Sequence, residues 1–244
     1  MTTATGAGLD AFAEFLASIP DVAQIEIARI KRAPRLQSRG GDSPAATDLM
    51  RQARDWYDSD GIPFWDALFV LGERDSGGVP DSVLQSALFH QDITDSARTV
   101  IGVDSSLGEN LRAVVAEYGD DWIVSMLSTV TMTDGSMRFL PMLDFTTKVV
   151  RSGARHTVEG ALRAMDEPGV LLSSGRSFHF YGQVPLTRDG MHRFLAKALL
   201  LAPITDSRWI AHQMLAGVAA LRISNDDRGR EPLLLRSALG GKKW

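Results

Sequence analysis

The first 120 residues show a mostly helical pattern of hydrophobic and polar positions. Apolar side chains between residues 9 and 19 recur at spacings of three and four, the period of an amphipathic helix. We expect a second helix over 21–30. Further apolar stripes predict helices over 47–58, 63–71, 81–90 and 107–118. Together they predict a helical N-terminal region over residues 1–120.

The pattern changes near residue 121 to alternating and continuous apolar runs. The pair Asp134-Gly135 between two such runs is typical of a β-hairpin. Downstream, the spacing predicts helices over 155–166, 187–201 and 206–216, and strands over 170–174, 177–184 and 218–224. Strands mixed with helices and hairpins indicate an α+β fold with a mixed or antiparallel sheet flanked by helices. We expect this second region to span residues 121–244.

The composition is that of a globular protein. Of the 244 residues, 44% are hydrophobic and 23% are charged, which suits one large domain or a core with a helical extension. The chain has no cysteine, so disulfides and thiolate metal sites are excluded, and a structural zinc site is not expected. Because neither a secretory signal nor a long apolar run is found, we expect a cytoplasmic protein without a membrane partner.

The charge is distributed unevenly. Residues 1–145 hold 11 Lys/Arg and 22 Asp/Glu, a net charge of −11, whereas residues 146–244 hold 15 and 8, a net charge of +7. One interpretation is that the basic part meets a polyanion. The other is that the two parts neutralise each other across an internal interface.

Two features of the N-terminal region each allow two interpretations. The stretch 29–46 carries five basic residues among Gly, Pro and Ser, so we expect a loop that either contacts phosphates or is simply solvated. The aromatic cluster at Trp56, Tyr57, Phe64, Trp65 and Phe69 is either a stacking platform or core. Its near-helical spacing favours core packing.

The segment MLDFTTK, residues 142–148, is the first of three that could carry chemistry. Asp144 closes an apolar strand, where a buried carboxylate is costly unless it is paired or metal-bound. The two-residue period of a strand places Asp144 and Thr146 on one face, with Lys148 next along it.

The segment SSGRSFHFYG, residues 173–182, is the second. Gly175 permits a tight turn, with Arg176 at the entrance of the following strand. Alternation places Ser177, His179 and Tyr181 on one face and two phenylalanines on the other. A polar face of this kind suits an anionic group such as a triphosphate.

The third segment covers residues 202–224. Asp206 lies where a helix begins, a position at which a simple N-cap is the alternative to a functional role. Arg222 interrupts an otherwise apolar strand, so its guanidinium should reach solvent, a ligand or a carboxylate.

In order and spacing, these segments resemble the archaeo-eukaryotic primase superfamily, the primase-polymerases. That family carries an acidic strand motif, a small-Gly-x-x-hydrophobic-His strand, a hydrophobic-Asp motif and often a later Leu-Arg pair. Here the corresponding residues are Leu143-Asp144, Ser174-Gly175 through His179, Thr205-Asp206 and Leu221-Arg222. The resemblance implies a primase-like core with an RRM-like sheet, and covers about 85 residues of the chain, roughly 138–224.

The resemblance implies metal-dependent nucleotidyl transfer on a nucleic-acid template, with Mg²⁺ or Mn²⁺ as cofactor. In such a site Asp144 and Asp206 would hold metal, and both would be catalytic together with His179. Arg176, Ser177 and His179 would hold the triphosphate. Arg222 would contact nucleotide or template, and Lys148 is a further candidate phosphate contact.

One departure from the family pattern separates two hypotheses. The first family motif usually has two acids, whereas here the second position is Thr146, a neutral and much weaker ligand for a hard cation. The chain is then either a divergent active primase or polymerase, or a nucleotide- or nucleic-acid-binding module that has lost fast catalysis. The expected partners are nucleic acid and nucleoside triphosphates, with a helicase or another replication or defence protein as a further candidate.

Overall fold

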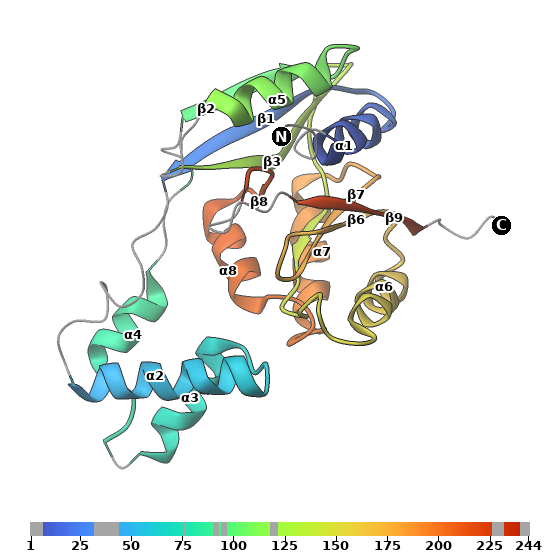
Figure 1. Ribbon diagram of the computed structural model, residues 1–244. Helices are drawn as coiled ribbons and strands as arrows, with labels where there is room; N and C mark the ends of the chain where they lie inside the picture. The colour runs from blue at the N-terminus through green and yellow to red at the C-terminus, as the bar shows by residue number, and fades with distance from the viewer. Residues whose placement is uncertain are drawn as a thin grey trace, which may run out of the picture. The chain divides into compact units, whose positions relative to one another are not determined.

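The protein forms two compact units in its computed structural model (Figure 1). One comprises Met1–Lys31 together with Asp92–Trp244, and the other comprises Arg32–Gln91. The structure describes residues 7–31, 44–75, 77–89, 93, 97–117, 122–225 and 232–239.

The first unit contains two antiparallel sheets. The first sheet has the strand order β2-β1-β3-β4, and β8 also pairs with β3. Its strands are β1 (Val22–Lys31), β2 (Ala97–Gly102), β3 (Trp122–Met132), β4 (Met137–Phe139) and β8 (Ala220–Arg222). The expected hairpin is present, since β3 and β4 are joined at Gly135, whose φ of +81° suits glycine.

The second sheet has the order β5-β7-β6-β9, and each of its neighbouring pairs is also antiparallel. Its strands are β5 (Met142–Asp144), β6 (Gly169–Ser173), β7 (Phe178–Gly182) and β9 (Leu233–Leu239). The chain leaves the first sheet after β4 and enters the second at β5. This transfer places Asp144 in a different sheet from the hairpin that precedes it. The predicted α+β class is confirmed, with two antiparallel sheets in place of one.

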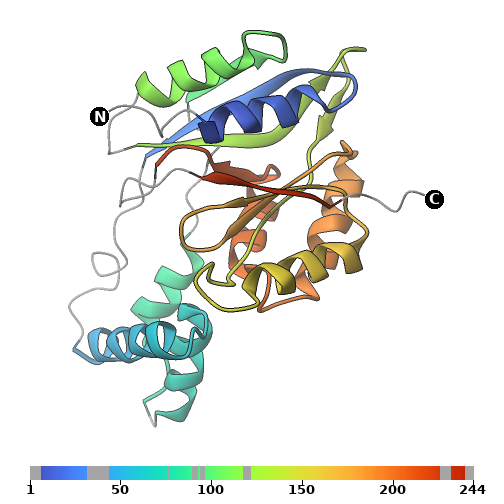
Figure 2. The same cartoon turned by 45° about the vertical axis from the view of Figure 1, so that its right-hand side comes forward.

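In the described part of this unit, five helices surround the sheets. They are α1 (Ala7–Ala17), α5 (Leu107–Glu117), α6 (Ala154–Met165), α7 (Arg188–Leu199) and α8 (Ser207–Ala216). Helices α1 and α5 pack together beside the first sheet, whereas α6 lies along the second (Figures 1 and 2). Helix α8 contacts both α7 and β5.

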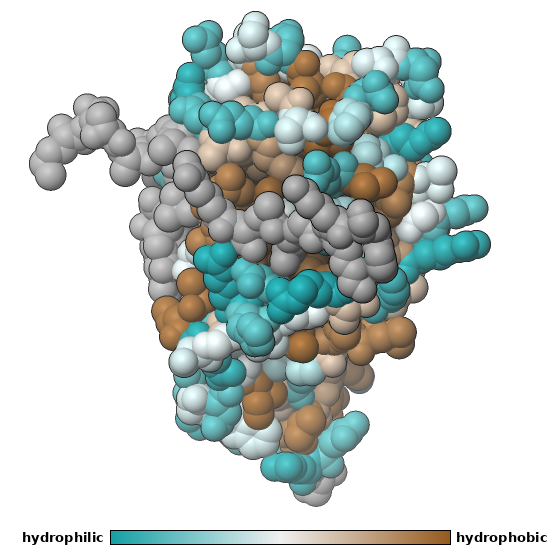
Figure 3. All heavy atoms as spheres, turned by 90° about the vertical axis from the view of Figure 1, so that its right-hand side faces the viewer, coloured by the Kyte–Doolittle hydropathy of each residue, from teal (hydrophilic) through white to brown (hydrophobic). Residues whose placement is uncertain are grey.

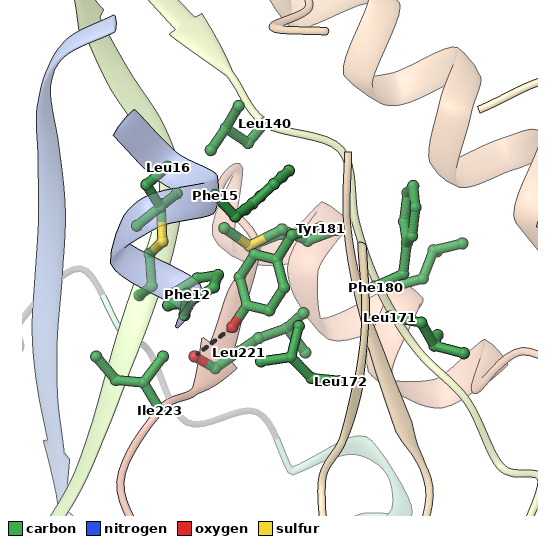
Figure 4. Close-up of a cluster of buried hydrophobic side chains, with 14 of the residues drawn as sticks. Phe12, Phe15, Leu16, Leu140, Leu171, Leu172, Phe180, Tyr181, Leu221 and Ile223 are labelled. Atoms are coloured by element: carbon green, nitrogen blue, oxygen red, sulfur yellow. Dashed lines mark hydrogen bonds between the residues drawn. The ribbon is translucent and has the colours of Figure 1, made fainter. Parts of the chain in front are cut away.

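The main hydrophobic core joins α1 to the second sheet. Figure 4 shows Tyr181 and Leu172 on the side of the sheet that faces α1, with Phe180 and Leu171 on the opposite side. The rings of Phe12 and Tyr181 lie 4.6 Å apart in a tilted arrangement, which stabilises the core through both burial and ring contact. Residues from the start of the chain are therefore part of the same core as the sheet that carries His179.

The second unit consists of α2 (Pro44–Ser59), α3 (Phe64–Arg74) and α4 (Asp81–Leu88). Its small core is formed by buried residues of these three helices, among them Leu49, Ala53 and Leu68. Four of the five clustered aromatic residues, all except Tyr57, pack against it. For those four residues, the interpretation as core packing is supported.

The predicted helix over 21–30 is wrong, because these residues form β1. Ile25 and Ile27 enter the core on one face, while Glu26 between them pairs with Arg98 of β2. This alternation, together with the β-branched residues, favours a strand. Because β1 pairs along its length with β3, the two compact units do not divide at the predicted boundary near residue 120.

Two strands, β2 and β9, were not expected from the sequence. Of the predicted basic loop over 29–46, residues 32–43 lie outside the described part. Residues 29–31 end β1, where the guanidinium of Arg29 lies over the ring of Trp122. On the face shown in Figure 3, hydrophilic and hydrophobic residues are interspersed. Among the described residues, no helix has the length and apolar character needed to cross a membrane.

Replacing Phe12 by Ala should lower the free energy of unfolding by about 3–5 kcal/mol, because the side chain is 1% exposed and packs on Tyr181. Chemical denaturation measures the loss. The matched control is Val150→Ala at a position that is 89% exposed, where we expect a change within about 0.5 kcal/mol. Equal effects of the two substitutions would contradict the assigned core.

Candidate functional site

The site is built around the pairing of β5 with β7. In the antiparallel register Asp144 lies directly opposite His179, so their side chains share one face. The His179 Nε2 atom lies 3.8 Å from Asp144 Oδ1, which is longer than a hydrogen bond. The imidazole is almost fully buried, with 6% exposed, whereas a quarter of the Asp144 side chain is exposed.

Asp206 is brought to Asp144 by backbone hydrogen bonds. The Asp206 N–H donates to the carbonyl of Asp144 at 3.0 Å, and Thr146 N–H donates to the carbonyl of Ile204 at the same distance. An isolated bridge between Phe145 and Thr205 lies between these bonds. The Asp206 side chain also caps α8, because its Oδ1 accepts a hydrogen bond from Trp209 N–H at 2.8 Å. Asp206 is therefore the N-cap of α8 and also lies beside Asp144.

The environment of Asp144 favours its protonated form. Burial raises the pKa of this carboxyl to about 8, and the negative charge of Asp206 adds to the rise. Hydrogen bonds from the Phe145 backbone and the Ser177 side chain oppose the shift, as does the positive charge of Arg222. The Asp144 carboxyl thus lies in a poorly solvated place within reach of the negative charge of Asp206, and a cation would stabilise its ionised form.

His179 is neutral over the physiological range. Burial lowers the pKa of its imidazole to about 3, and the positive charge of Arg222 lowers it further. The backbone of Arg222 opposes this shift as a hydrogen-bonding partner. A neutral imidazole can donate one hydrogen bond and accept another, or act as a ligand through a nitrogen.

The turn between β6 and β7 presents Ser177 to Asp144. Gly175 has a φ of +94°, a conformation that favours glycine and lets the chain reverse here. The hydroxyls of Ser174 and Ser177 lie 3.0 Å apart, and Ser177 Oγ donates to Asp144 Oδ1 at 3.4 Å. Ser174 is buried, and sequence reasoning assigned it no role. Its place next to Gly175 in the turn is the signal that could have found it.

Arg222 brings a positive charge from the first sheet to the second. Its Nη2 donates to the carbonyl of Ser174 at 2.8 Å, and its Nη1 donates to the carbonyl of Ser224. These bonds hold the guanidinium near both Asp144 and His179, whose pKa values it lowers. The sequence predicts that Arg222 reaches solvent, a ligand or a carboxylate, whereas these two hydrogen bonds go to backbone carbonyls and Asp144 experiences the positive charge of the guanidinium.

Tyr181 does not belong to the predicted polar surface. Its ring is fully buried against Phe12, and its hydroxyl donates to the carbonyl of Leu221 at 3.5 Å (Figure 4). Burial raises the pKa of the phenol well above its usual range. The strand period correctly placed this side chain on the face of His179. However, α1 covers this end of the face, which the local pattern could not reveal.

Lys148 and Arg176 lie near each other at the edge of the site. The Val149 N–H donates to the carbonyl of Arg176 at 2.8 Å, so the segment after Asp144 runs beside the turn that carries Ser177. The Arg176 side chain is exposed, and that of Lys148 is partly exposed. The backbone thus brings the segment that carries Lys148 next to Arg176, the residue before Ser177.

Thr146, at the position of the second family acid, is engaged with the backbone. Its hydroxyl hydrogen-bonds the carbonyl of Pro203 and, at 3.2 Å, that of Ile204. Across the described ranges, no three or more His, Asp or Glu side chains gather closely enough to hold a metal ion. Asp144, Asp206 and His179 are near one another without forming such a set in the described residues.

Comparison with known proteins identifies the family. Residues 105–234 match the model of the AEP-like family, described as archaeo-eukaryotic primase 1D-like, and this range contains Asp144, His179, Asp206 and Arg222. Searches of curated proteins and of solved structures returned no match, so they give no support for the expected helicase partner. The matched range covers more than half of the chain, which therefore belongs to the AEP-like family of archaeo-eukaryotic primases.

Proposed function

We propose that the protein adds nucleotides to a nucleic-acid strand in a metal-dependent reaction, at a site formed by Asp144, Asp206, Ser177, His179 and Arg222. The observation that carries the proposal is the hydrogen bond from Asp206 N–H to the carbonyl of Asp144, which brings two carboxylates together from segments sixty residues apart. Family membership supplies the reaction class that this pair would serve.

The donor set fits one divalent cation. Two carboxylates provide the hard oxygen ligands that Mg²⁺ and Mn²⁺ prefer, and the mutual repulsion of Asp144 and Asp206 would be relieved by a bound cation. When bound, such a cation would polarise the triphosphate and stabilise the charge that develops on it. The second cation of a two-metal site would need a carboxylate that Thr146 does not supply.

The remaining residues suit a triphosphate. Ser177 can donate its hydroxyl to a phosphate oxygen once it leaves Asp144, because its present bond of 3.4 Å is long. Neutral His179 can donate its single N–H to a phosphate in place of the backbone of Arg222, without adding charge. Arg222 is held in place by two carbonyls, so its guanidinium is preorganised to offset negative charge on nucleotide or template.

A basic surface next to the site suits the nucleic-acid backbone. Between Phe145 and Val158 the chain carries Lys148, Arg151, Arg155 and His156 and has no acidic residue. Arg151, Arg155 and His156 are exposed, with Arg155 ion-paired to Glu159 at 2.7 Å, and the backbone of Arg176 joins this segment through the bond from Val149. This placement favours the interpretation of the basic C-terminal part as a polyanion-binding region.

The hydrogen bonds of the Thr146 hydroxyl favour a second function, that of a module that binds its ligand with little catalysis. Its hydroxyl faces backbone carbonyls, so the family position that normally supplies an acid supplies no charge. Such a module would bind triphosphate or nucleic acid through Ser177, His179 and Arg222. Activity measurements separate the two functions.

The Asp144→Asn substitution should reduce primer extension and de novo priming with Mn²⁺ by at least about a hundredfold, because the cation loses one of two carboxylates. The matched control is Asp134→Asn in the β3–β4 turn, which removes a charge outside the site and keeps an acceptor for Ser136 N–H. Thermal unfolding verifies that each variant is folded. Wild-type activity in Asp144→Asn would contradict the proposed site.

Absence of product from the wild type with any template, together with nucleotide binding that His179→Ala weakens, would instead support the binding module. Absence of both activity and binding would refute both functions. Binding of a labelled triphosphate, followed by fluorescence anisotropy, supplies the second measurement.

Cation binding should depend on pH below about 8. Since the pKa of Asp144 is raised to about 8, its carboxyl must lose a proton to bind, and Mn²⁺ affinity should rise about tenfold per pH unit and level off above that pH. Titration followed by electron paramagnetic resonance measures this.

Without cation, the folded protein holds this proton more tightly than the unfolded chain does. Its stability should therefore fall as pH rises from about 4 to 8. The Asp144→Asn variant should lack this contribution. A stability profile identical in both proteins would contradict the raised pKa.

Binding of a single-stranded oligonucleotide should weaken uniformly across sequences in Arg151→Ala and Arg176→Ala. If each side chain neutralises one phosphate, the slope of log affinity against log salt should decrease by about 0.7 for each substitution. Arg193→Ala, which removes an exposed charge from α7, is the control and should leave the slope unchanged. Equal slopes in all four proteins would place the nucleic acid elsewhere.

A further inference from the structure

We propose that Thr146 is a positioning residue, which fastens residues 203–206 to the end of β5 and so sets where the carboxylate of Asp206 lies relative to that of Asp144. The role of the two carboxylates in this inference rests on the proposed function. The attachment itself rests only on hydrogen bonds.

The backbone alone aligns the two segments through two hydrogen bonds. Residues 144–146 run beside 204–206 through the bonds from Asp206 N–H to Asp144 and from Thr146 N–H to Ile204, with the bridge of Phe145 and Thr205 between them. Each of these bonds involves the carboxylate-bearing residues or their neighbours. A small shift of the 203–206 segment would therefore move Asp206 directly.

The Thr146 side chain adds a third connection, and it does so as a donor. Its hydroxyl has a single hydrogen, which faces the carbonyl oxygens of Pro203 and Ile204. An ionised aspartate only accepts hydrogen bonds, so at this position its oxygens would face two other acceptors. The geometry around residue 146 thus requires a donor, in the place where the family pattern has an acid.

A second hydroxyl holds the same segment from the opposite side. Thr205 is 1% exposed, and its Oγ1 donates to the carbonyl of Ala198 near the end of α7 at 2.7 Å. This residue also stands where the family prefers an apolar side chain. The two departures from the family pattern therefore act on one segment, which leads directly into Asp206 and its cap on α8.

This arrangement gives Thr146 a function other than that of a lost ligand. If it were only a lost ligand, Thr146→Asp would restore a second cation site and raise activity. If it is a positioning residue, the same substitution places a carboxylate against two carbonyls and displaces Asp206. The two interpretations predict opposite changes.

The test compares Thr146→Ser, Thr146→Val and Thr146→Asp with the wild type. Mn²⁺ affinity and stoichiometry are measured by electron paramagnetic resonance, and amide hydrogen exchange is followed at residues 203–206. Thr146→Ser should stay within about twofold of the wild type, because the donor remains. Thr146→Val should lose up to about tenfold in Mn²⁺ affinity and exchange the Asp206 amide faster by a similar factor. Thr146→Asp should bind Mn²⁺ no better than Thr146→Val and take up no second ion.

Thr157→Val is the matched control, because the Thr157 hydroxyl also donates to a backbone carbonyl, that of Gly153, in exposed surroundings. It should leave Mn²⁺ affinity and exchange at Asp206 unchanged. A second Mn²⁺ in Thr146→Asp would overturn the inference, as would unchanged exchange in Thr146→Val. If the wild type bound no Mn²⁺, the proposed function would fail while hydrogen exchange would still decide the role of Thr146.

Discussion

The pairing of residues 144–146 with residues 204–206 is the constraint on which the site depends. These segments come from a strand end and a helix start that are sixty residues apart, and their backbone bonds place Asp206 beside Asp144. The same pairing directs α8, because Asp206 is also its N-cap. These two backbone hydrogen bonds thus hold the start of α8, and with it Asp206, beside Asp144.

Electrostatics explains why this arrangement needs the rest of the fold. A carboxylate at the end of β5 is poorly solvated, and a second one nearby makes ionisation harder still. The positive charge of Arg222, which belongs to β8 in the first sheet, offsets part of the cost of ionising Asp144. Hydrogen bonds to the carbonyls of Ser174 and Ser224 hold this guanidinium near the carboxyl. His179 stays neutral beside it. The site therefore combines two neighbouring carboxyl groups, Asp144 and Asp206, with the guanidinium of Arg222. A divalent ion bound by the carboxylates and an anionic ligand bound near Arg222 would complete this arrangement.

The elements that carry the site residues could be predicted from the local pattern of hydrophobic and polar positions. The positions of Asp144, His179 and Asp206 on strand end, strand and helix start followed from spacing, and the order of the motifs indicated the family that the family model identifies. The N-terminal region was harder. Residues 21–30 have an apolar content that suits either a helix or a strand; their alternation favours a strand, and pairing with β2 and β3 stabilises it. Such pairing is a long-range property.

The roles of Tyr181 and Thr146 could not be predicted from the sequence, because they too depend on long-range contacts. Period-two alternation placed Tyr181 on the polar face, but a helix from the start of the chain covers that end. The residues next to Thr146 in the sequence do not indicate that its hydroxyl will contact the carbonyls of residues 203 and 204. Local sequence specifies which face a side chain occupies, whereas the fold specifies what meets that face.

The most direct test of the site is the position of Mn²⁺ in crystals of the protein grown with the ion and a nonhydrolysable nucleoside triphosphate. Anomalous scattering locates the ion without reference to activity. We expect one Mn²⁺ bound by the carboxylates of Asp144 and Asp206, with the triphosphate on Ser177 and His179 and the Thr146 hydroxyl still bonded to the carbonyls of Pro203 and Ile204. Mn²⁺ and triphosphate bound away from Asp144 and Asp206 would contradict it.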